Sequence, residues 1–279
     1  MTNYQVRQAA HPDDVKHYDT TKLRERFLFQ NVMQPDHVNM IYSLYDRVIA
    51  GGAVPVNKPL PLEAIDPLKA DYFLERREIG IVNIGGKGKI SVDGTDYELD
   101  YKESLYLGKS NKDVQFHSLD AQKPAHFYFV STPAHRVCPN KKITLADAEI
   151  VKLGSLEASN SRTINKLIVN SNVETCQLQL GMTELHPGSV WNTMPAHVHD
   201  RRMEWYFYFE VPQDQAICHF MGEPNETRNL WMHNEEAVVS PNWSIHAAAG
   251  TSNYTFIWGM GGENLNYGDV DASAVTDLK

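Results

Sequence analysis

Apolar residues recur at every second position along most of the chain after residue 38. The runs with this spacing are Met40/Tyr42/Leu44, Ile79/Ile81, Ile90/Val92, Cys176/Leu178/Leu180/Met182, Met203/Trp205/Phe207/Phe209 and Tyr254/Phe256/Trp258. A period of two is typical of β-strands, because successive side chains of a strand point to opposite faces. Turn residues separate the runs, and Asp93-Gly94 indicates a two-residue hairpin within residues 89–99. The pattern therefore predicts an all-β sandwich or barrel.

The period-two pattern lapses between residues 133 and 163, which we interpret as a connection between two β modules, 1–150 and 151–279. Short helices are expected before residue 35, where Pro12 suits a helix start. Residues 75–79 weakly resemble residues 200–204, which suggests that the modules repeat one another. The first module lacks histidines at the corresponding positions, so we expect it to be free of metal.

Composition excludes several classes of function. The chain has 26 Lys and Arg against 35 Asp and Glu, and a net charge of −9 argues against nucleic acid as a partner. No apolar run approaches the roughly 20 residues that cross a bilayer, and residues 1–14 do not resemble a signal peptide, so we expect a cytoplasmic protein without membrane contact. Three widely spaced cysteines, Cys138, Cys176 and Cys218, are expected to be reduced and packed.

Four residues form a candidate metal site. His197 and His199 are two positions apart, so on a strand their imidazoles would lie side by side on one face. Glu204 opens the next predicted strand, whose antiparallel return could bring its carboxylate to the same ion. His246 follows a proline turn far downstream. Three imidazoles and a carboxylate suit a divalent ion such as Zn, Fe, Mn or Ni.

The alternation of side chains extends this hypothesis along the strand after Glu204. If Glu204 points inward, then Arg202, Tyr206 and Tyr208 do so as well. The opposite face carries four large apolar side chains, which we expect to pack within the sandwich or to form an interface between subunits or modules. Four other histidines, His117, His126, His219 and His233, are expected to lie on the surface or to satisfy a hydrogen bond in the core.

The spacing of the two histidines, Glu204 and His246 resembles that of the cupin superfamily, whose members bind a metal inside a small jelly-roll barrel. Longer segments resemble one bicupin family, the 5-keto-4-deoxyuronate isomerases. These segments are LERREIGIVNIGG at 74–86, RTINK at 162–166, GSVWNTMP at 188–195, EWYFYF at 204–209, SPNWSIH at 240–246 and YTFIWGM at 254–260. The resemblance implies a double-stranded β-helix (jelly-roll) bicupin with a few short helices, and a homohexamer.

The resemblance also implies a function. It implies a Zn²⁺ ion at His197, His199, Glu204 and His246, acting as a Lewis acid. The implied reaction interconverts 5-dehydro-4-deoxy-D-glucuronate and 3-deoxy-D-glycero-2,5-hexodiulosonate, a ketol isomerisation in the breakdown of pectin and related polyuronides.

The roles of the remaining residues stay open. The small-molecule uronate substrate has a carboxylate, for which Arg162 and Arg202 are the candidate partners. Tyr206, Tyr208 and a metal-bound hydroxide are equal candidates for the base. Two other functions remain possible on the same fold: a metal-dependent oxygenase, and a non-catalytic bicupin that senses sugars or serves as a storage protein.

Overall fold

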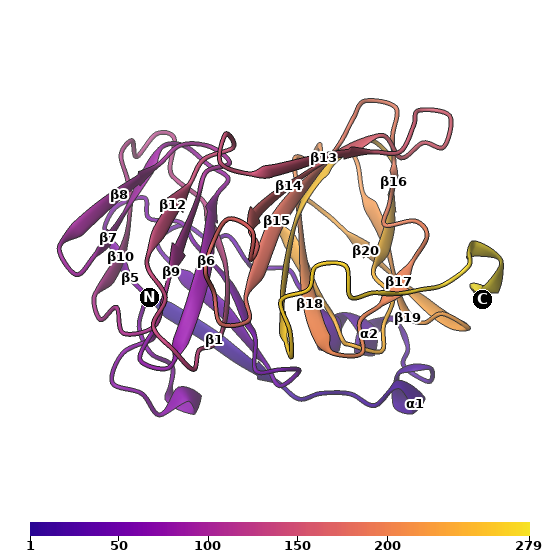
Figure 1. Cartoon of the computed structure of the whole chain (residues 1–279), viewed down its shortest axis with the longest axis horizontal. Helices are drawn as coiled ribbons and strands as arrows, with labels where there is room; N and C mark the ends of the chain where they lie inside the picture. Colours follow the sequence, from indigo (N-terminus) through magenta and orange to yellow (C-terminus); the bar gives the residue numbers. More distant parts are fainter. The chain divides into compact units, whose positions relative to one another are not determined.

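The computed structural model describes all residues from 1 to 279, and the chain divides into two compact units (Figure 1). Unit 1 comprises residues 1–7, 31–148 and 167–180, and unit 2 comprises residues 8–30, 149–166 and 181–279. Residues 8–30 thus belong to unit 2 and residues 167–180 to unit 1. The division into two continuous modules, 1–150 and 151–279, stays a prediction.

Unit 1 consists of two β-sheets. In spatial order, the seven-stranded sheet contains β1 (Thr2–Arg7), β3 (Val38–Ser43), β4 (Ile49–Ala53), β11 (Phe127–Pro133), β6 (Arg77–Asn83), β9 (Ser104–Leu107) and β12 (Lys141–Ile143). The four-stranded sheet contains β5 (Leu60–Pro61), β10 (Val114–Ser118), β7 (Gly88–Val92) and β8 (Thr95–Leu99). Neighbouring strands of both sheets pair antiparallel, except that β1 and β3 are parallel.

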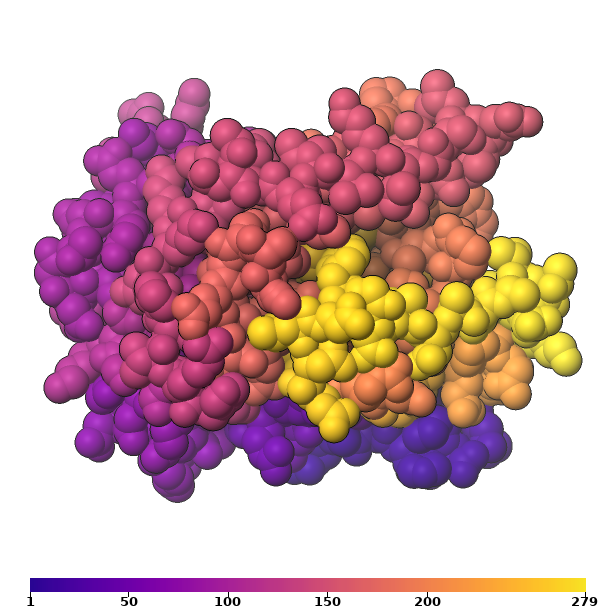
Figure 2. All heavy atoms as spheres, in the orientation of Figure 1, coloured from indigo at the N-terminus to yellow at the C-terminus, as the bar shows by residue number.

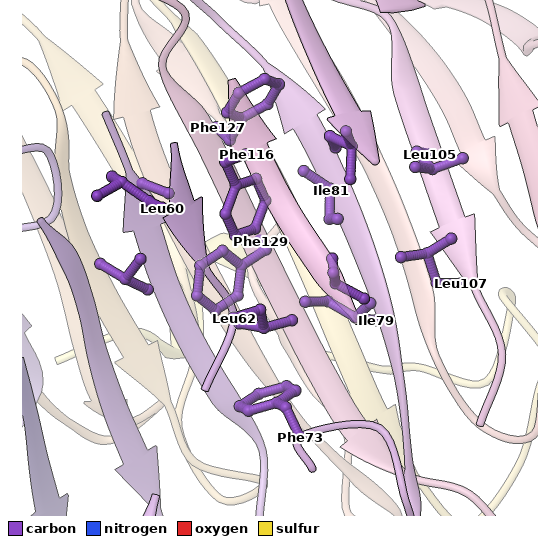
Figure 3. Packing of buried hydrophobic residues seen from close by; sticks show 14 of the residues in the cluster. Leu60, Leu62, Phe73, Ile79, Ile81, Leu105, Leu107, Phe116, Phe127 and Phe129 are labelled. Carbon is purple, nitrogen blue, oxygen red and sulfur yellow. The ribbon is translucent and has the colours of Figure 1, made fainter. Parts of the chain in front are cut away.

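The apolar faces of these two sheets form the core of unit 1 (Figure 3). Phe116 of the small sheet stacks on Phe129 of the large one, with ring centroids 6.2 Å apart, and both rings are fully buried. The predicted hairpin is confirmed, because β7 and β8 pair from Val92 and Thr95 outward. Asp93 and Gly94 form its turn with φ angles of 48° and 84°, which suit a primed turn.

Unit 2 contains the other sheets. A second seven-stranded sheet, most of which lies in unit 2, contains β13 (Glu149–Leu153), β14 (Arg162–Ile168), β15 (Gln179–Leu185), β23 (Thr255–Gly262), β18 (Arg202–Phe209), β21 (Glu236–Ser240) and β2 (Leu28–Phe29). A four-stranded sheet contains β16 (Trp191–Asn192), β22 (Ala247–Gly250), β19 (Ile217–Glu223) and β20 (Glu226–Met232). Two short strands, β17 (His197–Val198) and β24 (Asp271–Ala272), pair separately.

Helices are few and short. The α-helices are α1 (Pro12–Val15) and α2 (Thr20–Phe27), and the 3₁₀ helices are η1 (Asp66–Leu68) and η2 (Val275–Asp277). The Asp19 side chain caps α2 by accepting from the Lys22 N–H at 2.8 Å. Leu23 and Phe27 are buried, and α2 packs against β20 and β21, beside the orange strands in Figure 1. No helix of the chain has the length and apolarity to cross a bilayer.

Two local predictions need comment. The connection expected at residues 133–163 is not irregular throughout, since it includes β12 and β13. The alternating apolar side chains of β18 are buried together with the polar ones between them, so both faces of this strand are covered. The three cysteines are free thiols as predicted, with Cys138 buried and the other two half-buried.

Candidate metal centre

The two neighbouring histidines enter the site from β17 and the turn after it. The Nε2 atoms of His197 and His199 are 3.2 Å apart. Their rings lie edge to face, with centroids 4.7 Å apart. The spacing of two residues therefore brings both imidazoles to one point, as the sequence predicts.

Glu204 and His246 reach the same point from other elements. Glu204 lies in β18, where it is opposite Ser240 of β21 and Met260 of β23, so its backbone is fixed from both sides. Its Oε2 atom is 3.2 Å from the Nε2 of His199 and 3.1 Å from the Nε2 of His246. The Nε2 atoms of His246 and His197 are 3.0 Å apart.

These spacings fit one divalent ion. Ligand atoms about 2.1 Å from a metal are about 3.4 Å apart in tetrahedral coordination and about 3.0 Å apart in octahedral coordination. The observed separations of 3.0 to 3.2 Å lie within or close to this range. The three imidazoles form a cluster that could hold a metal ion. The Glu204 carboxylate lies next to two of these imidazoles. The distances between the ligand atoms do not select one divalent metal over another.

Electrostatics favour imidazoles that are ready to coordinate. Burial, reinforced by the neighbouring His199, lowers the pKa of His197 to about 3. Burial also holds the pKa of His246 well below its ordinary value. Both rings are therefore neutral at pH 7, which a metal ligand requires.

The Nδ1 atoms of two histidines contact the surrounding protein. Nδ1 of His246 is 3.2 Å from the Ser240 hydroxyl, and Nδ1 of His199 is 3.2 Å from the main-chain oxygen of Asp269. Such contacts fix the tautomer of a ligand and leave its Nε2 lone pair facing the cluster.

A cavity of about 240 Å³ opens beside the cluster. Its walls combine the candidate ligands with one arginine, several polar groups and an apolar side. The lining residues are Arg162, Ile164, Thr183, Asn192, Thr193, His197, His199, Glu204, Tyr206, Phe256, Trp258, Met260, Tyr267, Gly268 and Val270. A cavity of this mixed character suits a small polar organic molecule.

The two predicted carboxylate partners lie in different places. Arg162 lines the cavity and donates through Nη1 to the Asn160 carbonyl at 2.9 Å. Arg202 is 1% exposed and is not among the lining residues. Its guanidinium donates to the main-chain oxygens of Asn266 at 2.8 Å and Asp269 at 3.0 Å. The structure thus brings Arg162 but not Arg202 into the cavity.

The two candidate tyrosines also lie in different places. The Tyr206 hydroxyl lies 3.0 Å from the Thr193 hydroxyl on the cavity wall. Tyr208 is buried deeper, and its hydroxyl is 2.7 Å from Nδ1 of His219. Burial lowers the pKa of His219 to about 3, so its ring is neutral and plays the structural role expected from the sequence.

Several cavity residues were not predicted from the sequence. Tyr267, Gly268 and Val270 belong to a C-terminal segment without period-two alternation, so no pattern marked them. Asn192 ends strand β16, which has only two residues, and Thr193 follows it. Phe256 and Trp258 belong to a predicted strand. However, the alternation of side chains does not show which end of a strand borders a cavity.

Two β units, one with three converging imidazoles, place the chain among bicupin proteins with a candidate metal centre. The model of one family, the KduI/IolB family, matches residues 28–276. The chain belongs to this family.

Curated relatives match over the full length. A 4-deoxy-L-threo-5-hexosulose-uronate ketol-isomerase from Bacteroides fragilis (strain YCH46) is 63% identical over 278 residues, covering 100% of this chain and 99% of the relative. A protein of the same name from Lachnoclostridium phytofermentans is 54% identical and covers 99% of this chain and 100% of the relative.

Solved structures confirm the predicted fold class. An IolB-like protein from Salmonella typhimurium LT2 superposes with a TM-score of 0.70 at 13% identity, over 88% of this chain and 96% of that one. The oxalate decarboxylase of Bacillus subtilis, which has Mn(II) centres, gives a TM-score of 0.55 at 10% identity, over 80% of this chain and 71% of that one. At these identities the likeness concerns the fold alone.

Proposed function

We propose that this protein is a ketol-isomerase of 4-deoxy-L-threo-5-hexosulose uronate, with one divalent ion held by His197, His199, Glu204 and His246. The observation that carries the proposal is the convergence of these four side chains beside a cavity that also holds an arginine. The full-length identity of 63% to a relative with this name supports the choice of substrate.

The donor set fits a metal, because it offers three imidazoles, two of them buried, and a carboxylate at ligand spacing. We propose zinc, as the family resemblance implies. When bound, such an ion supplies Lewis acidity that polarises a carbonyl and favours proton transfer between adjacent carbons. The homohexamer and the cytoplasmic location that we expect for this chain stay predictions.

The chain's own residues orient the substrate. Arg162 is the arginine on the cavity wall, and a guanidinium matches a carboxylate through paired donors. We assign it to the substrate carboxylate, which leaves the aldehyde end for the histidine cluster. Tyr206 can donate its hydroxyl proton to a substrate oxygen that gains negative charge, while the Thr193 hydroxyl holds the phenol in place.

The activity is tested with purified protein, stripped of metal and then reloaded. The substrate is the product of an oligogalacturonate lyase digest, and NMR follows the aldehyde and ketone signals. We expect conversion only with metal, in anaerobic as well as aerated buffer. Conversion that consumes dioxygen would instead indicate an oxygenase, and no metal-dependent conversion would refute the proposal.

Replacing Arg162 with lysine is expected to raise KM at least about tenfold, because a charge-assisted pair contributes about 1.5 to 3 kcal/mol. Lysine keeps the charge but cannot form paired donors, so kcat should change less than KM. Steady-state kinetics measure both values. Arg202→Lys is the matched variant outside the cavity. If KM rises only in Arg202→Lys, the substrate carboxylate is bound by Arg202 and not by Arg162.

Tyr206→Phe is expected to lower kcat by about 100-fold, in the range for loss of one hydrogen-bond donor to a developing oxyanion. Metal content, measured by elemental analysis, should stay at the wild-type level. Tyr208→Phe removes a hydroxyl from the same face of β18 but outside the cavity, so its effect should fall on thermal stability. Equal losses of kcat in the two variants would contradict the assignment.

A further inference from the structure

The strap, which we define as residues 263–272, covers the candidate metal centre. It follows β23 and ends with β24, which pairs with the strand that carries His197. Its residues Tyr267, Gly268 and Val270 form part of the cavity wall. In Figure 2 the yellow C-terminal segment runs over the surface beside orange parts of the chain.

We propose that Asp269 is a positioning residue for the metal ligand His199, so that closure of the strap over the cavity and orientation of this imidazole occur together. The geometry of the four candidate ligands does not by itself require strap closure and imidazole orientation to occur together. The inference rests on the proposed metal site, and it adds a partner for His199 that lies 70 residues away in the sequence.

The Asp269 side chain is fixed by a bidentate ion pair. Arg201 donates from Nε to one carboxylate oxygen and from Nη2 to the other, each at 2.7 Å. Asn264 adds a hydrogen bond of 2.6 Å. Two parallel bonds to one guanidinium define orientation as well as distance, so they set the position of the whole residue.

The Asp269 backbone carbonyl is fixed as well. Arg202 donates to it at 3.0 Å and also to the carbonyls of Asn266 at 2.8 Å and Tyr267 at 3.3 Å. Because Arg202 is 1% exposed, these bonds are shielded from water. Two consecutive arginines of the chain thus hold Asp269, one through its side chain and the other through its main chain.

The fixed carbonyl faces Nδ1 of His199. Nδ1 lies 3.2 Å from the Asp269 oxygen and 3.4 Å from Nε of Arg202, and both contacts cannot be hydrogen bonds at once. Nε2 of His199 faces Glu204 and His197, so a ligand lone pair on Nε2 places the proton on Nδ1. That proton can only be donated to the carbonyl. The shorter contact is therefore the hydrogen bond.

The coupling works in both directions. If the closed strap tightens metal binding, then bound metal stabilises the closed strap by the same factor. Loss of a partner of this kind weakens metal affinity by about 10- to 100-fold in characterised sites. Loss of the contact between Asp269 and His199 would also release Tyr267 and Val270 from the cavity wall.

Asp269→Asn tests the inference, since it removes the charge with little change of shape. The dissociation constant of Zn²⁺ is measured on the full-length protein by competition with a chelator. We expect a value about 10- to 100-fold weaker than in the wild type. Asp271→Asn is the matched control, because Asp271 contacts the same Arg201 at 3.1 Å, whereas the carbonyl that faces Nδ1 of His199 belongs to Asp269. Its affinity should stay within about threefold of the wild type.

Hydrogen exchange of the wild type gives a second readout that needs no variant. We expect Zn²⁺ to slow amide exchange in residues 263–272, and Asp269→Asn to lose this effect. Equal affinities of the two variants, or exchange in the strap that ignores Zn²⁺, would overturn the inference while leaving the metal site intact. A wild-type protein that binds no Zn²⁺ would overturn the proposed metal site first, and the inference with it.

Discussion

Replacing His246 with glutamine is expected to abolish stoichiometric metal binding and to lower kcat/KM by about 1,000-fold or more. The Nε2 of His246 lies 3.0 Å from that of His197 and 3.1 Å from Oε2 of Glu204, so this side chain closes the ligand set. A Lewis acid contributes several kcal/mol of charge stabilisation to such a reaction, and about 1.4 kcal/mol corresponds to tenfold in rate. Elemental analysis and steady-state kinetics on one preparation measure both effects.

His233→Gln is the matched control, because the same substitution then occurs at an exposed histidine outside the cavity. Its metal content and kcat/KM should equal those of the wild type. Full metal content and activity in His246→Gln would show that the ion, if present, is held elsewhere. Far-ultraviolet circular dichroism of both variants separates loss of a ligand from loss of the fold.

The sequence predicts the candidate site well where geometry is local. His197 and His199 converge at a spacing of two residues, as predicted. Glu204 reaches them from β18, although β18 pairs with β21 and β23 and not with β17 as an antiparallel return would require. His246 depends on a distant turn, yet the structure brings it within 3.0 Å of His197. The role of these residues as metal ligands stays a prediction.

Alternation predicts the face of a side chain but not its surroundings. Arg202, Tyr206 and Tyr208 share the face of Glu204, yet only Tyr206 lines the cavity. Arg202 turns instead to the carbonyls of the strap, and main-chain acceptors leave no mark in a sequence. Tyr208 is held deeper by His219 on β19, a partner set by the packing of two sheets.

The all-β fold class follows from the period of two, whereas the composition of the units does not. Residues 8–30 belong to unit 2, where Leu28 and Phe29 pair with β21. A strand of two residues is too short to show a period. Long-range pairing of this kind depends on the tertiary structure, which local patterns do not encode.

Glu78→Gln is expected to lower the free energy of unfolding by about 3 to 5 kcal/mol. Glu78 is fully buried in unit 1 and accepts five hydrogen bonds. The donors are the Tyr106 hydroxyl at 2.6 Å, the Thr132 hydroxyl at 2.9 Å, and the backbone N–H groups of Cys176, Gln177 and Leu178 at 2.8, 2.8 and 2.9 Å. Both carboxylate oxygens therefore have partners.

An amide in that place turns an NH₂ group toward at least two of these donors, and each buried polar group left without a partner costs about 1 to 3 kcal/mol. Urea unfolding measures the loss of free energy. Amide hydrogens of the first residues of β15, which follow Leu178, should also exchange faster. Glu98→Gln is the control, because it removes only an exposed pair with Lys87, which contributes at most about 1 kcal/mol. If both variants unfold at the same urea concentration, the buried carboxylate does not hold residues 176–178, and their position must come from apolar packing alone.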